Sequence, residues 1–210
     1  MLMKKVVLFF CGLLSLCCHA QNISSVFGSM PKSLIMLADS IQRQDLMNVY
    51  NSEFPGNIKD KLNGKIVLSS FTEDFMELQS GNFSMQIALL KLVNDSKIIC
   101  LIQTVCAPVC DSQLSFYTVD WKPLNASDFI LPADVSWFIK DDTDKTGEGF
   151  INASKSLDMD LMQFSFDPKK LELTQIHTTP QYLSKEDRKA IAPFLKQEPK
   201  IFTWRKTGFK

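Results

Sequence analysis

The sequence contains little histidine and little glycine, and it has no excess of charge of either sign. Its 210 residues include two histidines, eight glycines, 23 basic and 23 acidic side chains. The balanced charge argues against a nucleic-acid partner, which usually contacts a strongly basic face. A single histidine, His177, lies beyond position 20, so zinc sites with two or three histidine ligands are excluded from that part of the chain.

Motifs of catalysis are also lacking. The sequence has no G-x-S-x-G nucleophile elbow and no glycine-rich loop that would hold a phosphate. A serine nucleophile would have to use His177 as its base, but we interpret this histidine as a turn or surface residue. No catalytic residue and no cofactor is therefore predicted.

Two aspartates imitate a catalytic carboxylate pair. Asp158 and Asp160 lie two residues apart on a predicted strand, and such side chains share one face of the strand. Glycosidase chemistry would need one of them to stay protonated in an apolar setting. We interpret both as the solvent-facing side of the strand, whose other face holds Leu157, Met159 and Leu161.

The first 20 residues have the pattern of a secretory signal peptide. Lys4 and Lys5 precede an apolar run over residues 6–18, and small side chains occupy the two positions that a signal peptidase reads, Cys18 and Ala20. The run is shorter than the roughly 20 residues that span a bilayer. We expect cleavage between Ala20 and Gln21.

A lipoprotein signal is an alternative interpretation of this leader. The stretch Leu14-Ser15-Leu16-Cys17 would attach a lipid to Cys17, although Leu16 is larger than the residue such signals prefer. An uncleaved anchor is a third alternative. Each of these signals predicts an extracytoplasmic protein. A periplasmic location is the first prediction, and a lipid-anchored or secreted protein is the alternative. No second run of transmembrane length follows the leader.

Residues 21–210 are expected to form one α+β domain, because a chain of this length suits a single core. Apolar residues with helical spacing over 23–30 predict a first helix, which Pro31 ends. A similar spacing from Ser33 to Tyr50 predicts a second helix and leaves a third helix open. We expect these N-terminal helices to pack on a sheet.

From Lys65 the sequence has the period of antiparallel strands. Apolar and polar residues alternate over 83–89, and Ser80-Gly81 predicts a tight hairpin with the strand before it. Residues 98–105 are apolar on both faces, which predicts a central strand. The short connections between neighbouring strands predict a mostly antiparallel meander sheet.

The C-terminal third predicts a second group of strands and a short helix. Apolar residues change parity within 157–166, which predicts a bulge near Leu161–Met162. Asp167-Pro168 predicts a type I turn into a return strand over 171–175. Ser184 followed by Asp187 predicts a capping box for a helix that ends near Pro193, and residues 201–204 predict the last strand.

These segments resemble a family of unknown function. The resemblance is carried by Phe27 with Met30-Pro31 and Ser33-Leu34, by Arg43 with Asp45-Leu46, and by the stretch Asp111-Ser112-Gln113-Leu114-Ser115-Phe116-Tyr117 leading to Asp120-Trp121-Lys122-Pro123-Leu124. Together they resemble an uncharacterised domain-of-unknown-function family of exported proteins from Bacteroides-like bacteria. The resemblance implies an extracytoplasmic α+β protein and assigns no functional residue.

Three cysteines follow the leader: Cys100, Cys106 and Cys110. A turn over residues 107–109 would place Cys106 opposite Cys110 in a hairpin, with a Cα separation of about 4.5–5.5 Å. A structural bridge and two free thiols are both open alternatives. A redox-active pair would need a helix N-terminus or a cationic neighbour, and neither is evident. Cys100 is expected to be an inert core residue.

An acidic segment begins like a calcium loop. In residues 142–153 the candidate metal ligands are Asp142 and Asp144, and glycine occupies the sixth position. The eighth position is Gly149 and the twelfth is Ala153, where a calcium loop needs a bidentate glutamate. We interpret the segment as an acidic surface loop.

Two hypotheses about function follow. The first is an exported, non-catalytic protein that binds an unknown envelope protein or ligand, or supports an envelope assembly. The alternative is an envelope hydrolase that uses carboxylates from separate strands. A pocket with converging carboxylates would favour the hydrolase, whereas an exposed apolar patch or an unpaired strand edge would favour the binding protein. Tyr117, Trp121 and Trp204 could line a sugar-binding surface, but aromatic residues on strands are more typical of a core.

Overall fold

The structure is a computed structural model that describes residues 22–35, 37–52, 56–59 and 64–210. The predicted signal peptide lies outside the described residues, as do the cleavage site between Ala20 and Gln21 and the alternative lipid attachment at Cys17. No helix within the described ranges is both long enough and apolar enough to cross a membrane.

Two helices begin the described chain, α1 (Ile23–Ser29) and α2 (Ser40–Ser52). The first helix is confirmed, but the described residues between Pro31 and Asp39 form turns, so helix does not begin near Ser33. The reason is local. The Asp39 carboxylate accepts hydrogen bonds from the backbone N–H groups of Ile41 and Gln42, and the Gln42 side chain accepts one from the Asp39 N–H. This reciprocal cap begins α2.

A seven-stranded antiparallel sheet follows, with its strands in sequence order. The strands are β1 (Gly56–Lys59), β2 (Lys65–Phe71), β3 (Phe75–Ser80), β4 (Phe83–Lys91), β5 (Lys97–Cys106), β6 (Cys110–Thr118) and β7 (Pro123–Leu124). The predicted meander is therefore confirmed. Gly81 has a φ of 59° in the hairpin between β3 and β4, a backbone conformation that glycine adopts without steric cost.

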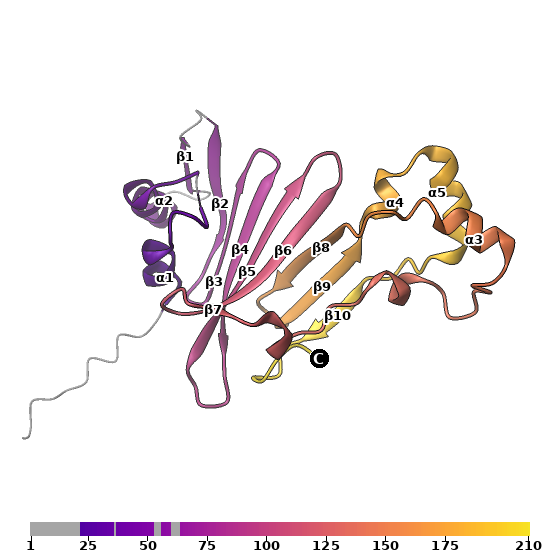
Figure 1. Cartoon of the computed structure of the whole chain (residues 1–210). Coiled ribbons are helices and arrows are strands. Elements are labelled where there is room, and N and C mark those ends of the chain that lie inside the picture. The colour runs from indigo at the N-terminus through magenta and orange to yellow at the C-terminus, as the bar shows by residue number, and fades with distance from the viewer. Residues whose placement is uncertain (1–21, 36, 53–55, 60–63) are drawn as a thin grey trace, which may run out of the picture.

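Both faces of the large sheet are covered. On β5, Ile99 and Leu101 belong to the core beneath α1 and α2, while Ile98, Cys100 and Ile102 belong to a second core on the other side. This confirms the prediction of a central strand that is apolar on both faces. Figure 1 shows the two helices on one side of the sheet and the later strands on the other.

A three-stranded antiparallel sheet covers the second face. Its strands, in the order β10-β9-β8, are β8 (Met162–Asp167), β9 (Glu172–His177) and β10 (Lys200–Thr203). The outer edge of β8 contacts side chains of the large sheet. The N–H groups of Met162, Phe164 and Phe166 donate to Asp111 Oδ1 (3.0 Å), Ser112 Oγ (3.0 Å) and Gln86 Oε1 (2.8 Å).

The predicted bulge near Leu161–Met162 is wrong, because residues 157–161 are not a strand. The Thr179 hydroxyl accepts a hydrogen bond from the Leu161 N–H (2.9 Å) and donates one to the Met159 carbonyl (2.6 Å). These two bonds hold the chain in an irregular conformation until β8 begins. The change of parity in the sequence therefore marks the start of the strand.

Short helices form a cap beyond the end of β9: α3 (Glu148–Ser154), α4 (Thr179–Tyr182) and α5 (Lys185–Ile191). They enclose a third apolar cluster that includes Phe150, Ile191 and Leu195. Ser184 is confirmed as the N-cap of α5, since its Oγ accepts the Asp187 N–H at 3.0 Å, and the Asp187 carboxylate accepts from the Ser184 hydroxyl (2.8 Å). The fold is α+β, as predicted, with N-terminal helices, antiparallel sheets and a short C-terminal helix (Figure 1).

Candidate functional site

The two aspartates that imitate a catalytic pair are exposed and lie outside any strand. Asp158 and Asp160 belong to the irregular segment before β8, so the prediction that they share a strand face is wrong. Their exposure also removes the apolar surroundings that would keep one carboxyl group protonated. The prediction that they contact solvent is confirmed.

The acidic loop is organised by its own hydrogen bonds. Asp144 Oδ1 accepts from the Thr146 hydroxyl (2.7 Å) and from the Thr146 N–H (2.9 Å), and these bonds hold the pKa of Asp144 below its usual range. Helix α3 begins at Glu148, the seventh position of the calcium-like segment that starts at Asp142. Within the described ranges, no group of three or more His, Cys, Asp or Glu side chains could hold a metal.

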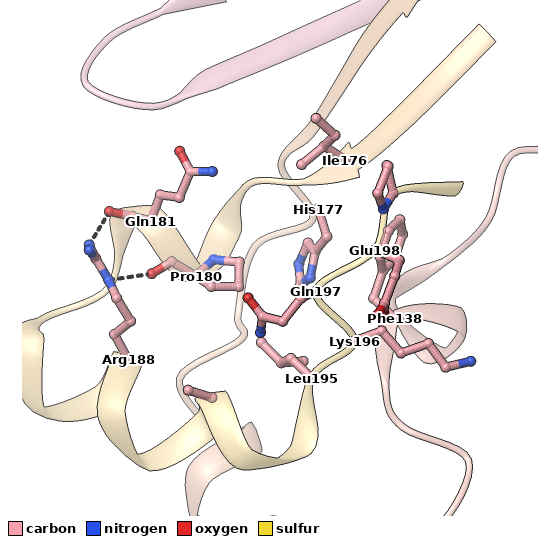
Figure 2. A pocket seen from close by; sticks show the side chains of 12 residues that line it. Phe138, Ile176, His177, Pro180, Gln181, Arg188, Leu195, Lys196, Gln197 and Glu198 are labelled. Atoms are coloured by element: carbon pink, nitrogen blue, oxygen red, sulfur yellow. Dashed lines mark hydrogen bonds between the residues drawn. The ribbon is translucent and has the colours of Figure 1, made fainter. Parts of the chain in front are cut away.

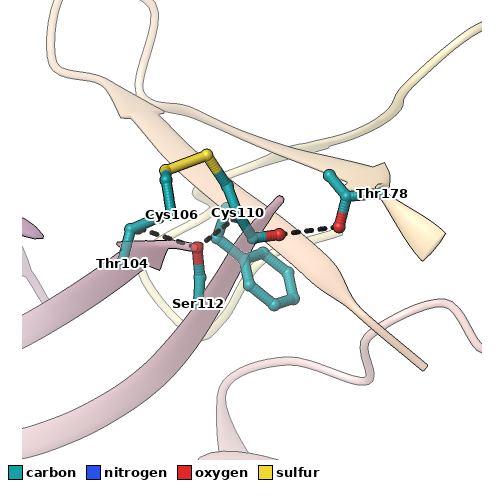
Figure 3. The surroundings of a disulfide bond; sticks show 6 residues. Thr104, Cys106, Cys110, Ser112 and Thr178 are labelled. Carbon is teal, nitrogen blue, oxygen red and sulfur yellow. Dashed lines mark hydrogen bonds between the residues drawn. A yellow bond between two sulfur atoms is a disulfide. The ribbon is translucent and has the colours of Figure 1, made fainter. Parts of the chain in front are cut away.

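The structure joins Cys106 and Cys110 in a disulfide at the end of the β5–β6 hairpin, with an S–S distance of 1.99 Å. Their Cα atoms are 3.8 Å apart, closer than the separation expected from the sequence. Figure 3 shows the Thr178 hydroxyl donating to the Cys110 carbonyl (2.7 Å), which fixes the hairpin to the end of β9. Cys100 is buried and free, and burial raises the pKa of its thiol far above the usual range.

The two tryptophans considered for sugar binding are core residues. Trp121 and Trp204 are 7% and 5% exposed. Each indole N–H donates to a backbone carbonyl, Trp121 to Val26 (3.0 Å) and Trp204 to Lys91 (2.9 Å). The core interpretation is confirmed for both.

His177 is the unexpected residue. It ends β9 with an exposed fraction of 8%, so the prediction of a turn or surface histidine is wrong. Neither ring nitrogen has a hydrogen-bond partner among the described residues. Burial lowers the pKa of His177, and the negative charge of Asp160 acts in the opposite direction without cancelling this effect. At neutral pH the imidazole is therefore uncharged, with one N–H donor and one acceptor nitrogen.

His177 lines a pocket of about 340 Å³ between the end of β9 and the helical cap. Its walls come from β9, from α4 and from the segment before β10, and they include Ile176, Pro180, Leu195, Gln197 and Pro199. Figure 2 shows the His177 ring with Pro180 and Leu195 on one side and Phe138 on the other. The ring centroids of His177 and Phe138 are 5.5 Å apart.

The cationic side chains at this pocket bind other parts of the protein. Arg188 Nε donates to the Pro180 carbonyl (2.9 Å), and its Nη2 donates to the Gln181 carbonyl. Lys196 Nζ contacts Asp141 Oδ1 at 2.8 Å, and in Figure 2 its ammonium group extends away from the His177 ring. The lining therefore combines apolar and uncharged polar groups with three charged residues, Arg188, Lys196 and Glu198.

A second cavity, of about 270 Å³, lies beside the disulfide-closed hairpin and is lined by Val105, Pro108, Met159 and Tyr182 among others. The buried side-chain atoms without a hydrogen-bond partner in the described residues belong to Arg43 and His177, and neither residue lines this second cavity. The His177 pocket is therefore the stronger candidate for a binding site.

A signal for the burial of His177 is present in the sequence. Leu173, Gln175 and His177 share one parity on β9, and the first two are 0% exposed. Extending the predicted return strand by two residues would have placed His177 on the buried face. The pocket itself has no such signal, because residues near His177, such as Pro180, form it together with Phe138 and Leu195, which tertiary packing brings to it.

The chain is similar to a solved structure and to a family model. The structure is of a domain of an uncharacterized protein from Porphyromonas gingivalis W83, with 25% sequence identity, a TM-score of 0.80, and coverage of 88% of this chain and 96% of that one. No curated protein matches the chain. The family model described as "Protein of unknown function (DUF3256)" matches residues 15–209. The chain therefore belongs to the DUF3256 family of proteins of unknown function.

Proposed function

We propose that the protein is an exported, non-catalytic binding protein whose ligand occupies the His177 pocket. The support for export is the leader pattern of the first 20 residues. The support for binding is one observation. His177 is more than nine-tenths buried, it lines a pocket, and both of its ring nitrogens lack a partner in the described residues.

A buried polar group without a hydrogen bond costs about 1–3 kcal/mol, and most such groups in folded proteins have a partner. A ligand that both accepts from and donates to the imidazole would remove this cost upon binding. The location supports this interpretation, because His177 belongs to the lining of the pocket together with Pro180 and Leu195, which lie beside it in Figure 2.

The contacts of His177 support a non-catalytic role. A histidine that activates a nucleophile or shuttles a proton usually has a hydroxyl, thiol or carboxylate within hydrogen-bond reach. Neither ring nitrogen has such a neighbour among the described residues. The exposed Asp158 and Asp160 do not supply the apolar carboxyl group that the alternative of an envelope hydrolase requires.

The test of binding is a fragment screen by ligand-observed NMR, performed on the protein as its host exports it. We expect a set of fragments to bind the wild type and to lose binding in His177→Leu, which removes both hydrogen-bonding nitrogens. Ile201→Ser is the matched control, because Ile201 is 51% exposed on β10. Circular dichroism verifies the fold of each variant. Fragments that bind His177→Leu as well as the wild type would refute the site.

The test of export is the N-terminus of the native protein, determined by mass spectrometry. We expect the chain to begin at Gln21. A chain that begins at an acylated Cys17 would favour the lipoprotein alternative, and an unprocessed Met1 would contradict cleavage altogether.

A further inference from the structure

We infer that the cavity beside the β5–β6 hairpin is a docking site for another protein, which inserts one apolar side chain and places a lysine or an arginine next to it. This inference goes beyond the proposed function and does not depend on the His177 pocket. It is carried by the exposed apolar side chains of the cavity, by the bonds that fix its walls, and by the carboxylates around it.

Apolar side chains that contact solvent gather at this cavity. Val105 and Tyr182 are each 51% exposed, and Met159 is 36% exposed. These three residues come from β5, from α4 and from the irregular segment before β8. The lining consists of these three together with Ala107, Pro108, Val109, Asp111 and Leu161. A hollow with exposed apolar side chains from several elements is typical of a protein interaction site.

Covalent and hydrogen bonds hold the walls of the cavity in place. The Cys106–Cys110 disulfide closes the hairpin, and the Thr178 hydroxyl donates to the Cys110 carbonyl (Figure 3). The Thr179 hydroxyl donates to the Met159 carbonyl at 2.6 Å. These bonds satisfy backbone groups of the walls, so the apolar side chains are the surface that a partner meets. Walls that are ordered before binding reduce the entropy that association costs.

Carboxylates surround the apolar part of the cavity. Among the described residues of the lining, Asp111 carries the charge. Asp158 and Asp160 are exposed and flank Met159 in the sequence. Within the described ranges, none of these three carboxylates has an ion-pair partner. A cation next to the inserted side chain would therefore meet attraction, whereas an acidic segment would meet repulsion.

The cationic residues of adjoining segments do not line the cavity. Lys155, Lys185 and Arg188 lie close in sequence to Met159 or Tyr182, and none of them belongs to the described lining. The Arg188 guanidinium donates to two carbonyls of α4, and Lys155 Nζ donates to a neighbouring asparagine side chain (3.0 Å). The carboxylates therefore set the charge that a partner meets at the cavity.

The size of the cavity suits one side chain of a protein better than a whole small molecule. Its volume of about 270 Å³ is below the roughly 300–1,000 Å³ of small-molecule sites. Such sites also orient their ligand with several convergent polar groups, whereas the polar side chains of this lining are those of Asp111 and Tyr182. Protein interfaces concentrate their affinity in a few side chains that fill pockets of this kind.

Three acetylated and amidated tripeptides test this inference. Lys-Leu-Lys has both an apolar side chain and cations, Glu-Leu-Glu reverses the charge, and Lys-Ala-Lys lacks the large side chain. The NMR signal of the Met159 methyl group, assigned with Met159→Leu, reports binding at the cavity. We expect Lys-Leu-Lys to shift this signal with a Kd on the order of 1 mM and the other two to bind at least about fivefold more weakly. Added salt should narrow the difference between the two leucine peptides.

Variants at exposed positions separate docking from folding, and circular dichroism verifies the fold of each. Val105→Arg places a long cationic side chain at the cavity and should weaken the binding of Lys-Leu-Lys at least about tenfold. Val93→Arg is the matched control, because Val93 is 68% exposed and precedes the opposite end of β5; it should leave the affinity unchanged. Replacing Asp158 and Asp160 together with asparagine should weaken Lys-Leu-Lys several-fold.

Each half of the inference can fail separately. Equal binding of Lys-Ala-Lys and Lys-Leu-Lys would overturn the apolar anchor, and equal binding of Glu-Leu-Glu would overturn the basic partner. A wild-type dimer in analytical ultracentrifugation that becomes monomeric in Val105→Arg would make the occupant a second copy of this chain and overturn the inference. If no peptide shifts the Met159 signal, the docking site is refuted, while the fragment screen at His177 tests the proposed function independently.

Discussion

The two faces of the large sheet are covered by different kinds of element, and their polar contacts differ accordingly. On the helix-covered face, Gln103 Nε2 on β5 donates to the Leu34 carbonyl (2.9 Å), and the polar contacts of α1 lie at its ends. The Ile23 N–H donates to the Glu73 carbonyl (2.8 Å), and the carbonyls of Val26 and Gly28 accept from Trp121 Nε1 and Arg43 Nη2, both at 3.0 Å. Between these ends, the contact is apolar.

On the sheet-covered face, the contacts run along the whole edge of β8. Three of its N–H groups, two residues apart, each meet a separate side-chain acceptor on the large sheet. A helix leaves backbone groups unpaired at its ends alone, whereas an edge strand leaves them at every second residue. The layer that packs against a strand edge must therefore supply a polar side chain for every second residue of that edge, whereas the layer beneath a helix needs polar partners at the helix ends.

The largest effect should come from the helix-covered face, because its polar contacts are few. We predict that Trp121→Ala lowers the free energy of unfolding by about 3–5 kcal/mol, since it removes a buried ring and leaves the Val26 carbonyl without the indole donor. Urea denaturation measures the loss. Trp121→Phe retains most of the volume and should recover a large part of it. A loss below about 1 kcal/mol for Trp121→Ala would show that one residue does not hold this face together.

A single change on the other face should cost less. We predict that Gln86→Leu lowers the free energy of unfolding by about 1–3 kcal/mol, because the Phe166 N–H loses its acceptor. The Gln86 amide also donates to Glu77 Oε1 (3.3 Å), so the comparison is made in a Glu77→Gln background, where Gln86→Glu keeps an acceptor oxygen and should cost less than the leucine variant. Asp111 is exposed, so water can replace its carboxylate and Asp111→Ala should cost less still. Equal losses in the leucine and glutamate variants would contradict the role of the acceptor.

The disulfide lies at the end of the hairpin that carries Asp111 and Ser112. We predict that replacing both Cys106 and Cys110 with serine costs about 2 kcal/mol, the loop-closure entropy of a short loop. Hydrogen exchange should also become faster at the N–H groups of Met162 and Phe164, because Asp111 and Ser112 accept the hydrogen bonds that these groups donate. Reduction of the wild type should reproduce both changes. Unchanged exchange rates would show that the acceptors keep their positions without the bridge.

The smallest effect concerns His177 and depends on pH. Because burial lowers the pKa of His177 in the folded protein, the unfolded chain takes up a proton at a higher pH than the folded chain does. Stability should therefore fall as the pH drops below about 6.5, with a slope of up to about 1.4 kcal/mol per pH unit, until the folded pKa is reached. Urea denaturation at pH 7.5 and 5.5 measures the loss. His177→Gln should abolish it, and an unchanged dependence in this variant would assign the loss to another group.

Sequence alone was sufficient to predict those elements whose structure depends on residues a few positions apart in the chain. Strand β4 follows from alternation over residues 83–89, β5 follows from the apolar run over 98–105, and the cap of α5 follows from Ser184 and Asp187. The cap of α2 has an equally local signal, in Asp39 and Gln42, which the interpretation of apolar spacing missed. The irregular segment before β8 has none, because its conformation depends on Thr179, 18 residues further along the chain.

The candidate site could be predicted in part. Strand parity is enough to bury His177, but its lack of partners depends on Phe138, Pro180 and Leu195, which tertiary packing brings to it from three separate segments. The pairing of Cys106 with Cys110 was within reach, since a hairpin between them is a local structure. The polar residues Asp111 and Ser112, which carried part of the family resemblance, had no role that sequence alone could assign.

The three acceptors that meet β8 also select its alignment. If β8 slid by one residue, every side chain of the strand would move to the opposite face of the small sheet, and Phe164 and Phe166 would leave the core. If it slid by two residues, one of the three acceptors would lose its N–H and each phenylalanine would leave its place in the core. The large sheet thus acts as a template on which the small sheet can settle in one position, and misaligned forms are disfavoured by packing and by lost hydrogen bonds.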